Sequence, residues 1–406
     1  MNSAVMNSIA TVPWQRRSLA VGVVALVICG VAAPSNPAPF LRAYLAAYLF
    51  YLGIALGSMV LLMAYHLTGG TWGLLIRRIL EASMRTLPLM AVLFLPIAYG
   101  IDYLYVWAQP EEVAVSAKLQ YQQFYLQPTY FWIRAAVYFA AWLAIATLLS
   151  AWSGREDQTG NARLARKSLK LSAVGAVVYG ISIHFASIDW AMSLEPLFHS
   201  SIWGPLMAAG QLLSALAFAI IVLSVLVRRP PLAEVVSLKV INDYGSLLLT
   251  LLILWTYMAW CQFMIVWIGN LPVDVVWYLP RATLGWKIVI GAIAVFHFAI
   301  PFFLLLMRPI KRSITALAGI SALILFMQLV FMVYEILPTF STQQLVGYWI
   351  AVLTPIGIGG IWLAEFLRQL QKRPLLAPHD YNRAAAMHLR HLDQEEAERE
   401  ETIVYG

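Results

Sequence analysis

The chain has 406 residues, of which 61% are hydrophobic and only 12% are charged. Soluble domains are closer to half apolar and a quarter charged, so this composition, with its mean hydropathy of +0.75, excludes an ordinary soluble globular protein. The apolar residues come in runs long enough to cross a bilayer, which takes about 20 residues per helix. The sequence therefore predicts an all-α polytopic membrane protein.

The net charge of +7 does not indicate nucleic-acid binding, because the basic residues fall in short loops between apolar runs. The two cysteines, Cys29 and Cys261, lie inside apolar runs and form no haem-attachment, iron–sulfur or zinc motif. We therefore expect this chain alone to bind no metal and no cofactor, so any redox metal would belong to a partner chain.

Successive apolar runs predict ten membrane-spanning helices. They cover residues 18–33, 41–65, 86–107, 129–152, 169–189, 203–227, 244–268, 284–306, 314–336 and 346–369. Basic residues stand almost entirely in the N-terminal segment and in every second loop, as Arg77 and Arg78 do. Because short cytoplasmic loops are enriched in lysine and arginine, both termini are predicted to be cytoplasmic.

The two halves of the chain carry matching residues in the same order. Asp102 and Gln262 each stand five residues before a tryptophan, and Arg134 and Lys287 each stand near the start of the following helix. Equivalent segments four helices apart point the same way, so the match predicts two four-helix bundles in a parallel pseudo-repeat plus two flanking helices. The predicted parts are flanking helix one (1–40), the bundles (41–190 and 191–340), flanking helix ten (341–372) and a charged cytoplasmic tail (373–406) with a short helix at 382–401.

The stretch from His184 to Pro205 holds a dense group of ionisable residues beside an apolar run, including Asp189 and Glu195. Ionisable groups at membrane depth cost at least a few kcal/mol each unless they are paired or hydrated, so such a cluster is typical of a working site. An interfacial loop whose charges face water explains the same stretch equally well.

Arg134 lies just inside the outer end of the fourth predicted helix, where an arginine needs a counter-ion. Asp189 or Asp102 can supply it, and His184 stands about one turn inside Asp189. These four residues are predicted to share the outer quarter of the first bundle. A purely structural ion pair is the alternative interpretation.

Lys287 with Glu335 is predicted to be the equivalent ion pair of the second bundle. This pair is expected to be weaker, because Gln262 replaces the carboxylate at the position of Asp102.

Glu81 and Asp102 are 21 residues apart, about 31 Å along one helix, so one helix would hold a carboxylate near each membrane face. This is the spacing of the two mouths of a proton path, unless Glu81 is a solvated loop charge beside its arginines. Polar residues that could support water between the mouths are Tyr99, Tyr138, Tyr179 and Ser182.

His297, near the middle of the eighth predicted helix, is either a relay in a proton path or a hydrogen-bonded packing histidine. His184 and His297 differ in depth by roughly 10 Å at 1.5 Å per residue, so they are not expected to ligate one haem. No nucleophile and base stand in a recognisable hydrolase motif.

The run from Ser187-Ile-Asp189-Trp190 through Glu195-Pro196 to Ile202-Trp203-Gly204, on a chain with two predicted four-helix bundles, resembles the NrfD/PsrC-like membrane subunits. Over about residues 40–370 the chain is most similar to the second such subunit of bacterial alternative complex III, a quinol:cytochrome c oxidoreductase.

The resemblance implies a respiratory complex in the bacterial plasma (inner) membrane. There a sister NrfD-like subunit would bind quinol beside an iron–sulfur subunit, and multihaem and monohaem c-type cytochromes, with small membrane subunits, would complete the assembly. This chain would supply scaffold and a proton route without a redox centre, and its own contact with quinone stays open. The path residues on this interpretation are Glu81, Asp102, Arg134, His184 and Asp189, with Lys287, His297 and Glu335 in the second bundle.

Two other functions fit the same composition. Parallel repeats and kinking prolines also suit a secondary transporter, although Pro96 has no proline partner at the equivalent position near Thr256. An inert membrane anchor for peripheral subunits would leave the buried charge pairs as structural contacts.

Overall fold

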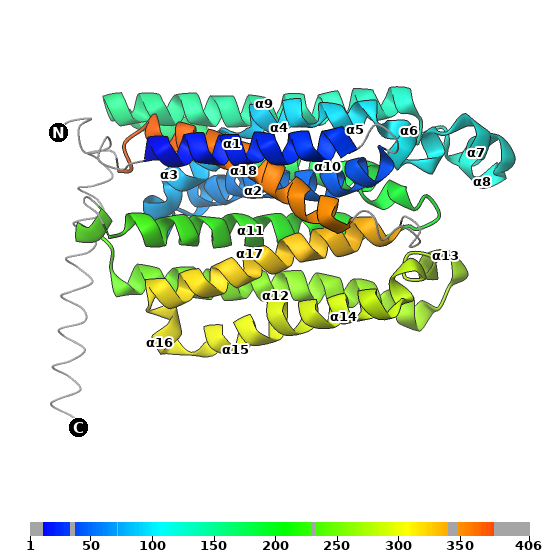
Figure 1. Cartoon of the computed structure of the whole chain (residues 1–406). Helices are drawn as coiled ribbons and strands as arrows, with labels where there is room; N and C mark the ends of the chain where they lie inside the picture. The colour runs from blue at the N-terminus through cyan, green and yellow to red at the C-terminus, as the bar shows by residue number, and fades with distance from the viewer. Residues whose placement is uncertain (1–10, 33–36, 71, 229–231, 340–347, 377–406) are drawn as a thin grey trace.

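The computed structural model describes residues 11–32, 37–70, 72–228, 232–339 and 348–376, and every regular element in these ranges is a helix. In this part of the chain ten helices are long and apolar enough to cross a membrane, which confirms the predicted all-α polytopic fold. They lie alongside one another, with their connections at two ends (Figure 1). The predicted tail helix at 382–401 lies outside the described residues.

Eight crossings are continuous helices and two are broken. The continuous ones are α1 (Thr11–Ala32), α2 (Ala38–Thr68), α9 (Pro128–Thr159), α10 (Ala162–Trp190), α11 (Trp203–Leu226), α12 (Leu238–Gly269), α17 (Ile314–Ile336) and α18 (Tyr348–Gln371). The third crossing consists of α3 (Trp72–Met84), α4 (Leu87–Leu93) and α5 (Leu95–Tyr99), and the eighth of α14 (Leu284–Ala292), the π-helical η6 (Ile293–Ala299) and α15 (Ile300–Leu306). Short connecting helices are α6 (Ile101–Leu104), η2 (Val106–Ala108), α7 (Pro110–Val115), α8 (Ala117–Gln122), η3 (Met192–Leu194), η4 (Leu232–Glu234), α13 (Pro272–Val275), η5 (Pro280–Ala282), α16 (Arg308–Lys311) and η7 (Leu337–Thr339).

Prolines account for both broken crossings. Pro88 and Pro96 stand in the first turns of α4 and α5, where a missing amide hydrogen is tolerated but the preceding helix cannot continue. Pro301 crowds the carbonyl of His297, four residues earlier, and the helix widens to a π-helix over η6.

The predicted start of the third crossing at residue 86 is wrong, because the crossing begins at Trp72. The charged residues of α3 lowered its apparent hydrophobicity, yet every residue from Gly73 to Met84 is buried. The single helix predicted from Glu81 to Asp102 is also wrong, since Asp102 belongs to α6, beyond the breaks at Pro88, Pro96 and Gly100.

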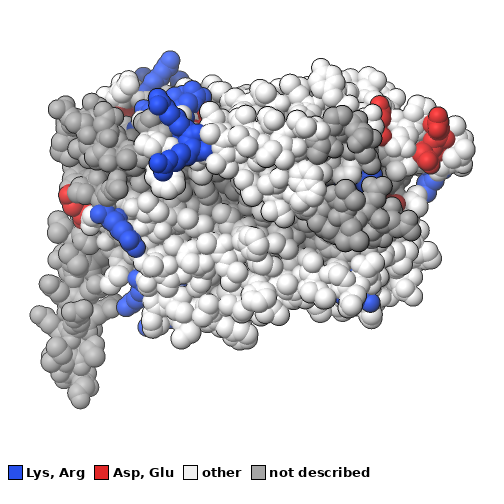
Figure 2. Space-filling view, in the orientation of Figure 1, with Lys and Arg blue, Asp and Glu red and all other residues white. Residues whose placement is uncertain are grey.

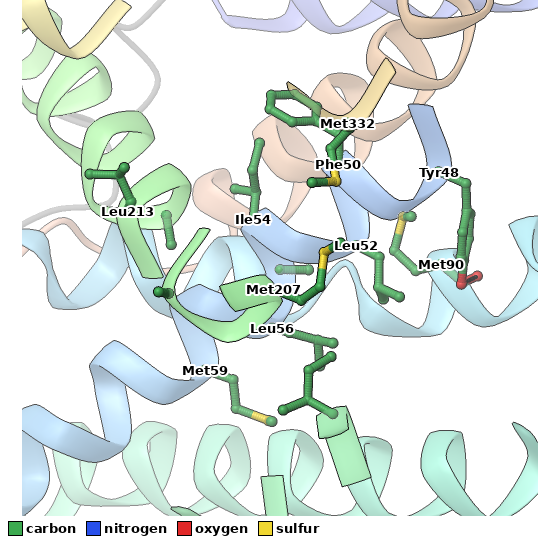
Figure 3. Packing of buried hydrophobic residues seen from close by; sticks show 14 of the residues in the cluster. Tyr48, Phe50, Leu52, Ile54, Leu56, Met59, Met90, Met207, Leu213 and Met332 are labelled. Atoms are coloured by element: carbon green, nitrogen blue, oxygen red, sulfur yellow. Dashed lines mark hydrogen bonds between the residues drawn. The ribbon is translucent and has the colours of Figure 1, made fainter. Parts of the chain in front are cut away.

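Helices α2 and α11 form the centre of the molecule. They pack against each other, and α2 also contacts α3, α10, α17 and α18. Gly57 of α2 lies against the main-chain carbonyl of Gln211, an approach that a side chain would block. Around this contact Phe50, Met207 and Met332 bring three helices together (Figure 3). The division into two parallel bundles stays a prediction.

Loops with the basic residues lie at the end where α1 begins and α18 finishes, which we call the basic end (Figures 1 and 2). It carries the starts of α3, α10 and α12 and the finish of α9. The other end, where α2, α9, α11 and α18 begin, is called the far end. The basic loops gather at one end, as predicted from the basic residues in every second loop of the sequence.

The first helix is attached mainly through α18. Gly22 of α1 meets Gly357 and Gly360 of α18, where a Cβ atom at Gly22 would lie 2.7 Å from the carbonyl oxygen of Gly357. The thiol of Cys29 lies 3.9 Å from Thr354 Oγ1 and is completely buried. Without an apolar driving force in lipid, such close backbone packing holds helices together.

Replacing Gly360 by leucine is predicted to separate α1 from α18. The new Cβ would lie 2.5 Å from the carbonyl oxygen of Ser18, a backbone atom with little freedom to move. Such overpacking typically costs about 1–3 kcal/mol or more. In a Cys261→Ser background, a thiol-reactive dye should label Cys29 at a lower temperature than in the parent. Gly319→Leu is the control, because no atom lies near that Cβ position, and equal labelling temperatures for both variants would refute the packing described here.

Candidate functional site: buried charges at the two ends

At the far end, Asp189 and Arg134 form a buried ion pair. Both carboxylate oxygens of Asp189 accept from Arg134, Oδ2 from Nε at 2.8 Å and Oδ1 from Nη2 at 2.9 Å. The hydroxyl of Tyr138 donates to Oδ2 at 2.8 Å, and the Asp189 side chain is fully shielded from solvent. This bidentate geometry with a third donor is the arrangement that makes a buried carboxylate tolerable.

Neighbouring elements fix the guanidinium of Arg134. Its Nη1 donates to the carbonyl oxygen of Tyr125 at 2.9 Å, and its charged centre lies 3.8 Å from the centroid of the Tyr125 ring. Tyr125 precedes α9, so the connection after α8 packs over the first turns of the helix that carries Arg134. The predicted choice between Asp189 and Asp102 as counter-ion is thus decided in favour of Asp189.

The other two residues predicted for this group lie elsewhere. Asp102 has an exposed side chain, and its backbone carbonyl accepts from Gln109 Nε2 at 2.8 Å. His184 is half-buried and packs against Gly204 of α11. His184 and Asp189 are five residues apart, so they point to different sides of α10, and no hydrogen bond joins them among the described residues. The four-residue cluster predicted from sequence therefore reduces to Arg134 and Asp189.

The predicted pairing of Lys287 with Glu335 is also wrong. Lys287 has an exposed side chain, whereas the cation near Glu335 is Arg281, which is 3% exposed and was missed by sequence reasoning. Nη2 of Arg281 donates to the main-chain carbonyl of Glu335 at 2.6 Å. Arg281 lies in η5, ahead of the spanning helix, where the hydrophobic pattern of the sequence does not indicate that a side chain is buried.

At the basic end, Glu81 is the centre of a second cluster and is fully buried. Oε1 accepts from Arg77 Nε at 3.1 Å and from Ser153 Oγ at 2.6 Å. Oε2 accepts from Arg78 Nη1 at 2.7 Å and from Arg373 Nη1 at 3.1 Å. The alternative that Glu81 is a solvated loop charge is therefore wrong.

Two further carboxylates of α9 complete the ion pairs of the basic-end cluster. Arg77 lies 3.5 Å from Glu156, and Arg78 forms an ion pair of 2.6 Å with Asp157, so three arginines including Arg373 face three carboxylates including Glu81. Arg373 also donates to the carbonyl oxygen of Ser150 at 2.7 Å, which ties the segment after α18 to α9. Its role could not be found from sequence, because the positive-inside rule already explains a basic residue at that place.

Polar side chains of α9 and α10 lie between the two clusters, where these helices face each other or α2 and α11. We call Asp189, Tyr138, Trp142, Ser182, Tyr179, Ser172 and Ser153 the polar ladder. Ser172, Tyr179, Ser182 and Asp189 follow one another at steps of seven, three and seven residues, which places them on one side of α10.

Hydrogen bonds connect the ladder to its neighbours. Trp142 Nε1 donates to Ser182 Oγ at 2.8 Å, and the Tyr179 hydroxyl donates to Gln211 Oε1 at 2.8 Å. Ser172 Oγ lies 2.9 Å from His66 Nδ1 of α2. Tyr138, Tyr179 and Ser182 are buried between the two clusters, whereas Tyr99, predicted with them, is 80% exposed.

A cavity of about 30 Å³ lies beside the ladder, between α2, α10, α11 and α17. Ser187, Gln211, Ser214 and Gln328 contribute its polar side chains, and Gln328 Oε1 is buried with no hydrogen-bond partner among the described residues. A space of this size holds a water molecule where polar partners are present.

His297 lies in the second half, in the π-helical η6. Its side chain is completely buried against Trp255, with ring centroids 4.1 Å apart. Neither ring nitrogen has a hydrogen-bond partner within the described ranges, so the predicted hydrogen-bonded packing histidine is not what is found. Whether His297 relays protons stays a prediction.

Among the described residues, no group of three or more His, Cys, Asp and Glu side chains is placed to hold a metal ion. Comparisons with known proteins add no family, since neither a protein-family profile nor a curated protein sequence matches the chain.

Replacing Arg134 by alanine is predicted to destabilise the protein strongly, because it leaves Asp189 buried without a cation. Breaking a buried pair costs about 3–5 kcal/mol, and the 19% exposure of the Arg134 side chain favours the lower end. Thermal unfolding in detergent should show a clear loss, and Arg134→Ala combined with Asp189→Asn should recover part of it. An unchanged melting temperature for Arg134→Ala would mean that Arg134 is solvated.

Proposed function

We propose that this chain is an integral membrane subunit of a bacterial respiratory quinol-oxidising complex of the alternative complex III type. It provides scaffold and a proton route and holds no redox centre of its own. The Asp189-Trp190 to Gly204 motif supports the family, and the basic loops at one end support cytoplasmic termini in the plasma membrane.

The observation that carries the proton route is the polar ladder between two buried carboxylates. Asp189 lies near the far end and Glu81 near the basic end, and hydroxyl and indole groups stand between them along α9 and α10. Seven-residue steps along α10 correspond to roughly 10 Å, a gap that bound water has to bridge. If the buried ion pairs at the two ends had only a structural role, polar groups between them would not be required.

The route works by exchanging the charge state of a paired carboxylate. A proton reaching Asp189 neutralises it, which weakens its hold on Arg134, and the proton then moves on through the Tyr138 hydroxyl and water. At the basic end the three arginines keep Glu81 ionised, so a proton there passes between neighbouring hydroxyl groups such as Ser153.

The partners follow from the same proposal. A sister NrfD-like subunit binds the quinol, an iron–sulfur subunit accepts its electrons, and multihaem and monohaem c-type cytochromes with small membrane subunits complete the complex. Haem c and iron–sulfur clusters reside on those chains.

The transporter alternative is disfavoured by where the helices are broken. Transporters with internal repeats have interrupted helices at corresponding places in both halves. Here the breaks fall in the third and eighth crossings, whereas α12 and α9, the crossings that correspond to them in the predicted repeat, are continuous.

Purification from native membranes tests membership of a complex. A tag on this chain is expected to bring down chains with c-type haem absorbance and a reducible iron–sulfur signal, in mild detergent. Recovery of the chain alone, folded and without haem, would reject the complex and favour the transporter.

Within the purified complex, Tyr138→Phe is expected to lower the number of protons moved per electron while quinol oxidation continues. The change removes one hydroxyl that donates to Asp189 and keeps the ring. Proteoliposomes with a pH-sensitive dye measure the ratio. Tyr103→Phe is the control because Tyr103 is 53% exposed, and equal ratios for the two variants would exclude the ladder as the route.

A further inference from the structure

Glu335, near the far end of α17, has a carboxylate oxygen without a donor. The residue is 5% exposed, and its Oε2 is buried with no hydrogen-bond partner in any described part of the chain. Asp189 at the same end has three donated hydrogen bonds to its carboxylate. Of these two buried acids at the far end, Asp189 therefore has donors for its carboxylate, whereas Oε2 of Glu335 has none among the described residues.

The only cation facing Glu335 among the described residues, Arg281, directs its hydrogens elsewhere. Its Nε donates to the carbonyl oxygen of Tyr334 at 3.2 Å, and its Nη1 donates to that of Trp277. Nη2 donates to the main-chain oxygen of Glu335 and to Thr339 Oγ1 at 3.3 Å. The guanidinium also stacks on the Trp277 ring at 3.8 Å, so main chain and indole hold it in place.

The other groups around Glu335 are uncharged phenols or lie farther away. Tyr278 precedes η5, and burial raises the pKa of its phenol well above the ordinary value. Tyr334 is the preceding residue on α17, and Glu195 interacts electrostatically with Arg281. Burial lowers the pKa of Arg281, but the group stays a cation at neutral pH.

An ionised carboxylate whose oxygen lacks a donor is costly at this depth, whereas the protonated acid is neutral and costs far less. We propose that Glu335 is a proton-binding site of the far end that carries its proton in the resting protein, and that Arg281 is the group that allows its release. The use of this site in proton transfer rests on the proposed function, but the protonation itself does not.

Release is a simple proton transfer. The O–H bond of the Glu335 carboxyl breaks, a water molecule at the far end takes the proton, and the electron pair stays on the carboxylate. Nη2 of Arg281 already bonds the main chain of Glu335, so the positive charge of the guanidinium stabilises the new anion from its present position. Protonation reverses the transfer.

Infrared spectroscopy of the isolated chain in nanodiscs tests the site without any partner. Wild type at neutral pH is expected to have a protonated carboxyl C=O band that shifts in deuterated water and disappears at high pH. Glu335→Gln should lose that band. Asp189→Asn is the matched control and should keep it, because both carboxylate oxygens of Asp189 already accept hydrogen bonds from Arg134 and Tyr138.

A band that persists in Glu335→Gln, or that vanishes in Asp189→Asn instead, would overturn the proposal. If Glu335→Gln fails to fold, Glu335→Asp serves in its place, and a displaced band is expected; an unmoved band would overturn the proposal equally. Because no haem-bearing chain takes part, failure here leaves the complex untouched, and recovery of the chain alone from membranes leaves the protonation result standing.

Discussion

The arrangement of this protein depends on the cost of placing charge in a medium of low dielectric constant. Lipid hydrocarbon cannot solvate a guanidinium or carboxylate, so each charged side chain inside the membrane must find its partner within the chain. Glu81 with its arginines and Asp189 with Arg134 meet that requirement at the two ends. The Glu81 cluster joins α3 to α9 and to the segment after α18, and the Arg134–Asp189 pair joins the consecutive helices α9 and α10, so charge pairing also fixes which helices are neighbours.

The position of the last described segment depends on the same contacts. Arg373 lies directly after α18 and reaches back to Glu81 of α3 and Ser150 of α9, so the last described segment closes over the third and fourth crossings. The same helix α18 holds α1 through facing glycines. The basic end is therefore stabilised by polar contacts, while the centre depends on close packing of α2 with α11.

Periodic and compositional signals predicted the ten crossings and the placement of basic loops, because hydrophobic length and loop charge are properties of single segments. Arg134 with Asp189 was predictable, since an arginine at that depth needs a carboxylate. The predicted burial of Asp102 beside Arg134 and the predicted pairing of Lys287 with Glu335 were wrong, because the orientation of a side chain depends on helix breaks and packing. Arg281 and Arg373 were missed because each lies outside a spanning helix and folds back into the protein.

The proposed proton route requires the fixed charges to be held firmly, so that only selected groups titrate. Substitution of Glu81 tests whether the charges are held in this way. In nanodiscs, Glu81→Gln is expected to lower the free energy of unfolding by about 3 kcal/mol or more, because three guanidinium groups lose their shared buried anion. Glu111→Gln, at an exposed acid of α7, should leave it unchanged. Equal stability of Glu81→Gln and the parent protein would show that the basic-end charges are solvated and that charge pairing does not organise this fold.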